Sequence, residues 1–223
     1  MRPAEILHLL RLELRLDLHQ RHAVGGSLLY VVSAVFVAYQ AMQGRAEGTA
    51  WNALFWIILL FAAFNTLARS FQREDAGQHL YLYTLADPRN VILARVIYGA
   101  GTMLVLSLLS FGTYVLFLGH APLNDANVGQ YLLAVVAGGT GFAAVLTLVS
   151  AIASRAGNGV GLMAVLGFPI VLPLLLSAIK AGRLALIGMP WTVTGKYLLW
   201  LGLVDVIAVT LAWVLFPYLW RDR

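Results

Sequence analysis

The chain contains no phosphate-binding loop of the kind that ATP hydrolysis requires. Such a loop ends in Gly-Lys followed by Ser or Thr, whose hydroxyl binds Mg²⁺ beside the phosphates. The one Gly-Lys pair, Gly195 and Lys196, is followed by Tyr197, and the preceding glycine, Gly188, lies seven positions before Gly195 instead of five. Any ATP hydrolysis connected with this protein is therefore expected on a separate chain.

The histidines do not have the spacing of a metal site. His8, His19 and His22 lie in a charged N-terminal segment, whereas His79 and His120 stand apart from it and from each other. The chain has no His-Glu-x-x-His sequence and no cysteine, so no ligand set is visible. Axial ligation of haem needs only one or two side chains, which leaves a haem contact at His120 as an alternative. We assign no bound cofactor.

Asp205 is the one ionisable residue well inside an apolar stretch. A charge is costly in the hydrocarbon core, so an intramembrane carboxyl is a functional candidate by default. The alternative is that Asp205 lies about two turns from a helix end, protonated or hydrogen-bonded to a neighbouring helix. No second intramembrane carboxylate or base accompanies it, and no nucleophile with a base is visible. We therefore expect a chain without catalysis of its own.

The composition restricts the chain to one class of protein. Of its 223 residues, 61% are hydrophobic and 11% are charged, whereas a soluble domain is about 45–50% apolar and about 25% charged. These values exclude a soluble enzyme, a disordered chain and, without cysteine, a disulfide-stapled domain. The net charge of +5 indicates orientation in a membrane rather than a nucleic-acid partner.

Six apolar runs, uncharged apart from Asp205 in the last of them, are long enough to cross a hydrocarbon core, which takes about 20 helical residues. They are roughly Ala23 to Met42, Trp51 to Ala68, Val96 to Leu118, Val128 to Ala153, Val160 to Ile179 and Tyr197 to Leu219. Strand-like alternation is absent from them. The sequence predicts an all-α integral membrane protein with six transmembrane helices in a single domain, residues 1–223.

The Lys and Arg residues are distributed unevenly between the two ends of such a bundle. Eleven of the fifteen lie on the side of the termini, which predicts that both termini are cytoplasmic. The connection between the fifth and sixth runs opposes this bias with Lys180, Arg183 and Lys196. That connection also holds Pro190 and Trp191, and it is long enough for a short interfacial or re-entrant element.

Residues 3–22 predict an amphipathic helix that lies along the inner membrane surface. When the segment is placed on a helix, its basic side chains fall on one stripe that includes Arg11, Arg15 and His19. We expect these three residues to anchor the helix at the headgroups or to face a partner, while leucines contact acyl chains.

Residues 69–95 form the longest connection on the side of the termini. The segment begins with a charged cluster, Arg73, Glu74 and Asp75, and has a helix break at Gly77 and a turn at Asp87. It could form a short helix across the membrane face, available for docking.

Two packing signals lie within the apolar runs. Small residues recur four apart in the fourth run, as Ala134 and Gly138 and as Ala137 and Gly141, and they would let another helix approach closely. In the fifth run Pro169 and Pro173 predict a kink or a locally unwound segment.

This arrangement of spans and connections resembles the permease subunit of type-2 ABC exporters. Within that class the chain resembles the haem exporter protein B (CcmB) family of the cytochrome c maturation system. The matching motifs are RLELR at 11–15, F-x-x-E-D-x-G at 71–77 and GVGLMAVLGFPIVLPLLL at 159–176. One departure follows the second motif, where family members usually carry a Glu and this chain reads QHLY at 78–81.

The resemblance implies a non-catalytic permease subunit in a bacterial inner membrane. ATP would be hydrolysed by a soluble CcmA-like ABC ATPase subunit, with Arg73, Glu74, Asp75 and Gly77 as its docking residues. The other implied partners are CcmC-like and CcmD-like membrane proteins and a CcmE-like haem chaperone, with two permease copies per complex or pairing with another membrane subunit. Haem would be cargo, and ATP hydrolysis would release the haem-loaded chaperone.

Two alternatives stay open at the level of sequence. One is an exporter permease for a lipid, a drug or a polysaccharide. The other is a membrane scaffold that holds haem-handling proteins together without transport. An intramembrane enzyme ranks behind both, because paired catalytic groups are missing.

Overall fold

The computed structural model describes residues 3–19, 21–42, 47–67, 87–155 and 159–221. In these residues the chain forms seven α-helices and one short 3-10 helix, and no strand. The α-helices are α1 (Pro3–His19), α2 (Arg21–Met42), α3 (Gly48–Leu67), α5 (Pro88–Leu118), α6 (Val128–Arg155), α7 (Gly159–Leu186) and α8 (Trp191–Arg221). All except α1 are long and apolar enough to cross a membrane. The predicted all-α membrane protein with six spans is confirmed.

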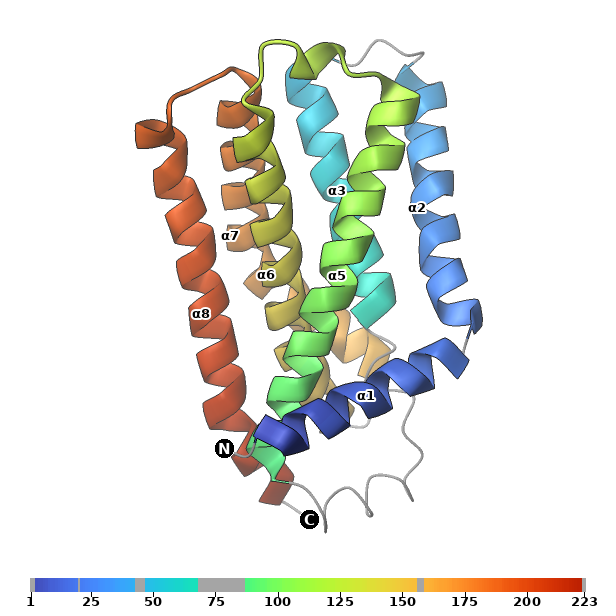
Figure 1. Ribbon diagram of the computed structural model, residues 1–223, viewed down its shortest axis with the longest axis vertical. Coiled ribbons are helices and arrows are strands. Elements are labelled where there is room, and N and C mark those ends of the chain that lie inside the picture. Colours follow the sequence, from blue (N-terminus) through green and yellow to red (C-terminus); the bar gives the residue numbers. More distant parts are fainter. Residues whose placement is uncertain (1–2, 20, 43–46, 68–86, 156–158, 222–223) are drawn as a thin grey trace.

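The six spanning helices stand side by side, and α1 lies across one end of the bundle (Figure 1). The N- and C-termini lie at this same end, which we call the terminal end, and we call the opposite end the loop end. Helix α6 is central, because it packs against α3, α5, α7 and α8. The structure thus agrees with two termini on one side, and their cytoplasmic location stays a prediction.

Helix α5 begins eight residues before the run predicted from its lack of charge. The Asp87 side chain accepts a hydrogen bond from the backbone N of Arg89 at 3.0 Å, and Pro88 occupies the first turn. An acidic N-cap followed by proline is a strong helix start. The predicted connection, residues 69–95, is therefore wrong for residues 88–95, which belong to α5. Residues 68–86 lie outside the described part of the chain.

The connection between α7 and α8 is also shorter than predicted. Helix α7 continues to Leu186 and α8 begins at Trp191, so only residues 187–190 join them. The chain turns there at Gly188, whose φ of 68° favours glycine. The predicted interfacial or re-entrant element is wrong. Lys180 and Lys196 lie instead on the spanning helices themselves.

Two other predicted boundaries change in the structure. The N-terminal helix ends at His19, and residues 21–22 already belong to α2. Helix α7 stays helical through Pro169 and Pro173, so the expectation of local unwinding is wrong. Both prolines are exposed on the outer face of the helix.

Trp56 of α3 fills a space that two glycines leave open at the centre of the bundle. A Cβ atom on Gly138 of α6 would lie 2.5 Å from the Trp56 ring, and one on Gly182 of α7 would lie 3.0 Å from its Nε1. The sequence prediction of close helix approach at the small residues of α6 is confirmed here and at Gly141, which packs against α7 and α8.

The buried amide of Asn52 joins the same three helices. Its Nδ2 donates to the carbonyl oxygen of Ile179 in α7 at 2.8 Å. Its Oδ1 accepts from Trp56 Nε1 at 3.1 Å and from the Tyr131 hydroxyl of α6 at 3.2 Å. Each of these polar groups would be costly to leave unpaired without water. The network therefore fixes α3, α6 and α7 relative to one another.

Replacing Gly138 with Ala is expected to destabilise the protein by about 1–3 kcal/mol, because the new methyl group overpacks the Trp56 ring. In a helical chain of this size that corresponds to a fall of roughly 3–10 °C in the thermal unfolding midpoint, measured by circular dichroism in detergent. Gly112→Ala is the matched control, since nothing lies within 4 Å of a Cβ there. Equal midpoints for the two variants would contradict the packing role of Gly138.

Candidate functional site

At the terminal end, Glu5 of α1 holds the point at which residues 68–86 lead into α5. Its Oε1 accepts from the backbone N of Asp87 at 3.0 Å, and its Oε2 accepts from Asn90 Nδ2 at 2.9 Å. Asn90 is buried, with 2% of its surface exposed. One carboxylate therefore binds both the N-cap and the first turn of α5.

A second acidic residue of α1 contacts α5 further along both helices. Glu13 Oε1 lies 3.3 Å from Arg95 Nε, and the Arg95 side chain is 5% exposed. Residues 5 and 13 of α1 and residues 87 and 95 of α5 are each about two turns apart. Loss of either partner would leave a charge in a buried place, which is strongly destabilising. The two acidic residues thus fasten α1 along the beginning of α5.

The beginning of α5 also contacts α8. The guanidinium carbon of Arg89 lies 4.6 Å from the centre of the Trp213 ring, which is within the range of a cation–π interaction. Helices α1, α5 and α8 are therefore joined next to Asp87. We call this group the terminal clamp: Glu5, Glu13, Asp87, Arg89, Asn90, Arg95 and Trp213.

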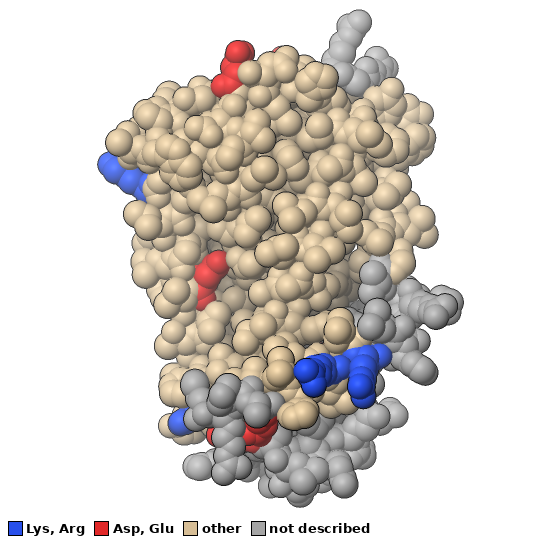
Figure 2. Space-filling view, viewed as in Figure 1, with Lys and Arg blue, Asp and Glu red and all other residues tan. Residues whose placement is uncertain are grey.

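The structure separates the charges of α1 onto two faces. Arg11 and Arg15, predicted to anchor the helix, are exposed, whereas Glu5 and Glu13 are partly buried toward α5. Blue atoms gather near this end in Figure 2. The side chain of His19 lies outside the described residues. Membrane anchoring by the exposed residues stays a prediction.

Sequence reasoning missed the part that the two acidic residues play. Glu5 and Glu13 are eight positions apart and so share a face of α1, away from the basic stripe. That spacing could have indicated an acidic face of α1 that contacts another helix, but the partners at the start of α5 could be named only from the structure. The predicted docking residues, Arg73, Glu74, Asp75 and Gly77, lie outside the described part of the chain.

Asp205 lies in the middle of α8, about 20 Å along the helix from Trp191. The alternative is wrong in placing it about two turns from a helix end, because α8 begins six residues before the predicted run. The hydrogen bond to a neighbouring helix that this alternative expected is present. Among the described parts of the six spans, Asp205 is the only acidic residue. Figure 2 shows acidic atoms at the surface midway between the two ends of the molecule.

The Asp205 carboxyl packs on the polar and small residues of α6. Its Oδ2 accepts a hydrogen bond from Thr140 Oγ1 at 3.2 Å. The same Oγ1 lies 3.0 Å from the backbone carbonyl oxygens of Val136 and Ala137, which compete for its hydrogen. A hydroxyl has one hydrogen to donate, so the bond to Asp205 is shared. Oδ1 is buried against Gly141 and has no hydrogen-bond partner within the described residues.

His120, the alternative haem contact, is exposed in the connection at the loop end. It precedes the 3-10 helix Ala121–Leu123. Among the described residues no three His, Cys, Asp or Glu side chains are grouped as metal ligands. A contact between haem and His120 therefore stays a hypothesis from the sequence.

Comparison with known families identifies this architecture. The family model described as CcmB protein matches residues 4–217, which include almost all of α1 and of the six spans. The chain belongs to the CcmB family. Proteins of this family are haem exporter permeases of cytochrome c maturation, so the chain is a membrane permease subunit of that type. A search of curated proteins finds no significant match.

Replacing Glu5 with Ala is expected to loosen the start of α5, because Asp87 N and Asn90 Nδ2 lose a charged acceptor. We expect amide hydrogen exchange in peptides covering 87–95 to accelerate about threefold to tenfold, measured by mass spectrometry on the detergent-solubilised protein. Arg11→Ala is the control, since Arg11 is exposed on the other face of the same helix. If both variants exchange like the unmodified protein, Glu5 does not hold α5.

Proposed function

We propose that this CcmB chain converts ATP hydrolysis on a separate, soluble CcmA-like subunit into movement of its own helices. Family membership supports the permease role. The observation that carries the coupling is the terminal clamp, in which Glu5 of α1 binds the backbone of Asp87 where the connection enters α5. The ATPase would bind that connection through Arg73, Glu74, Asp75 and Gly77.

A force on the connection would move three helices together. Asp87 is bonded to α1 through Glu5, and Arg89, two residues later, contacts Trp213 of α8. Arg95 and Glu13 prevent α1 from turning about a single contact. Closure of the ATPase would therefore displace α1, the start of α5 and the end of α8 as one body.

Inside the membrane, Asp205 would limit how α8 moves against α6. The Thr140 hydroxyl of α6 donates a shared hydrogen bond to the Asp205 carboxyl of α8. The rest of the buried face of α8 is apolar apart from Thr194, and apolar contacts can slide without losing a specific partner. The shared bond is therefore a latch that holds one register and breaks at modest cost.

In this proposal the movement of the helices serves the delivery of haem to c-type cytochromes. With the termini in the cytoplasm of a bacterium, the complex would sit in the inner membrane and carry haem as cargo. It would include CcmC-like and CcmD-like proteins and two permease copies, or another membrane subunit in place of the second copy. ATP hydrolysis would release the haem-loaded CcmE-like chaperone, while Arg11, Arg15 and His19 hold α1 at the membrane surface.

Reversing two charges of the connection, Arg73→Glu with Asp75→Lys, is expected to abolish copurification of the ATPase and to reduce haem staining of c-type cytochromes at least severalfold. Repulsion replaces attraction at the docking surface. Asp125→Lys is the matched control, because Asp125 is exposed at the opposite end of the bundle. The docking proposal fails if the ATPase still copurifies and haem staining is unchanged.

A catalytically dead ATPase partner separates coupling from scaffolding. With ATP hydrolysis removed and the complex still assembled, we expect loss of cytochrome haem staining. Normal staining under these conditions would favour a scaffold, whatever the charge-reversed variant does.

Asp205→Leu is expected to impair cytochrome maturation without lowering the thermal unfolding midpoint, since leucine suits hydrocarbon better than a carboxyl. Asp205→Asn keeps an oxygen acceptor for Thr140 and should retain most activity. Haem staining and circular dichroism on the same variants provide the comparison. Full activity of Asp205→Leu would refute the latch.

A further inference from the structure

Three cations lie on the spanning helices near the loop end. Lys180 and Arg183 belong to α7 and Lys196 belongs to α8, and all three side chains are exposed. No carboxylate in the described part of the chain forms an ion pair with any of them. They also oppose the bias that places most Lys and Arg at the terminal end. These exposed cations are therefore available to an anion from outside the described chain.

The depth of these cations matches the headgroup boundary of a bilayer. Helix α7 has 28 residues and is about 42 Å long, close to the full bilayer thickness of about 40–45 Å with headgroups. Lys180 lies six residues before its last residue, or about 9 Å from that end. Lys196 lies five residues after the start of α8, at about the same depth. Because a hydrocarbon core of about 30 Å leaves roughly 5–8 Å of headgroup region on each side, both cations lie at the boundary between headgroups and hydrocarbon, from which their long side chains reach toward the lipid phosphates.

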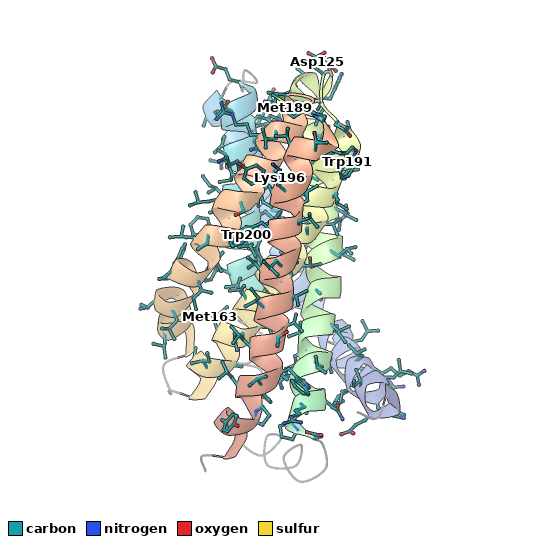
Figure 3. The ribbon with its side chains drawn as sticks, turned by 90° about the vertical axis from the view of Figure 1, so that its left-hand side faces the viewer. Asp125, Met163, Met189, Trp191, Lys196 and Trp200 are labelled. Atoms are coloured by element: carbon teal, nitrogen blue, oxygen red, sulfur yellow. The ribbon has the colours of Figure 1, made fainter. Side chains whose placement is uncertain are left out.

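Aromatic side chains surround the cations on the same surface. The Lys180 ammonium lies 5.0 Å from the centre of the Tyr197 ring, which connects α7 to α8. Trp200 follows Lys196 by one helical turn and is 52% exposed. Figure 3 shows Trp191, Lys196 and Trp200 in succession along α8. Trp191, at the start of α8 and 55% exposed, lies at the level where tryptophans typically contact lipid headgroups, and Trp200 lies about 14 Å further along the helix.

An apolar stripe continues from the cations toward the membrane centre. On α7 the residues four and eight positions before Lys180 are Leu176, 63% exposed, and Leu172, 45% exposed. This spacing puts them on the same side of the helix as Lys180. Cations above an apolar stripe fit a molecule with an anionic head and hydrocarbon chains.

We propose that Lys180, Arg183 and Lys196, with Trp200, form a binding site for an anionic phospholipid, which we call the loop-end lipid site. The headgroup phosphate would bind the three cations, and the acyl chains would lie along Leu172 and Leu176. An acidic protein segment would neutralise the three cations, but it would leave the apolar stripe below them uncovered. The inference depends neither on the proposed ATP coupling nor on which side of the membrane the loop end faces.

The test uses the full chain in bilayers and the quenching of tryptophan fluorescence by brominated lipids. Brominated phosphatidylglycerol is compared with brominated phosphatidylcholine, which has no net charge. The contribution of Trp191 and Trp200 is obtained by subtracting the signal of the Trp191→Phe/Trp200→Phe variant. We expect phosphatidylglycerol to bind next to these residues at least about fivefold more tightly.

Two charge variants test whether the cations cause this preference. Lys180→Gln/Arg183→Gln/Lys196→Gln should bring the ratio of binding constants to about one, whereas Lys180→Arg/Arg183→Lys/Lys196→Arg, which keeps every charge, should preserve it. Circular dichroism of both variants establishes that the bundle is folded. Equal binding of the two lipids to the unmodified chain, or a preference that survives in the glutamine variant, would overturn the proposal.

The same quenching measurement on the chain copurified with its partners tests whether a protein, and not a lipid, covers the loop-end lipid site. Quenching of Trp191 and Trp200 by phosphatidylglycerol should persist in the complex. Loss of quenching by both lipids would mean that a protein covers this surface and would overturn the assignment to a lipid.

Discussion

The arrangement of the bundle depends on the requirement that a polar side chain buried among apolar helices find a partner within the protein. Asn52 meets that requirement with Ile179, Trp56 and Tyr131, and so three helices are held by one amide. The contacts are short because glycines of α6 and α7 leave space for the Trp56 ring. A shift of any of these helices would break several hydrogen bonds and overlap packed atoms. Helices α3, α6 and α7 therefore form the part of the molecule that is hardest to rearrange.

Charged groups join another set of helices at the terminal end. Helices α1, α5 and α8 meet there in the terminal clamp, while further along α5 the Tyr114 hydroxyl donates to the carbonyl oxygen of Trp51 in α3 at 2.7 Å. Within the membrane, the Asp205 carboxyl of α8 accepts only a shared hydrogen bond from the Thr140 hydroxyl of α6. In the proposed coupling, the body formed by α3, α6 and α7 would resist displacement, while α1, the start of α5 and the end of α8 would move against it.

The number and type of the helices follow from the sequence, because hydrocarbon excludes charges over a length that any run of 20 apolar residues reveals. The boundaries do not follow so simply. Arg89 and Arg95 appeared to end a span, yet one stacks on Trp213 and the other pairs with Glu13, so α5 continues through both. Lys180 and Lys196 lie on exposed faces, where long side chains reach the interface without ending a helix.

The same reasoning explains which parts of the site were found. Asp205 stands out in any apolar run, and small residues in α6 predict close packing, because each signal is contained in one segment. Glu5 and Asp87 are far apart in the chain, and only the folded structure joins them. Arg95 pairs with Glu13 and serves the fold, whereas Lys180 and Lys196 have no carboxylate partner in the described chain. The Tyr197 ring contacts Lys180 but carries no charge, and an unneutralised cation near the hydrocarbon boundary is costly, so the phosphate of a bound lipid would supply the anion that the described chain does not.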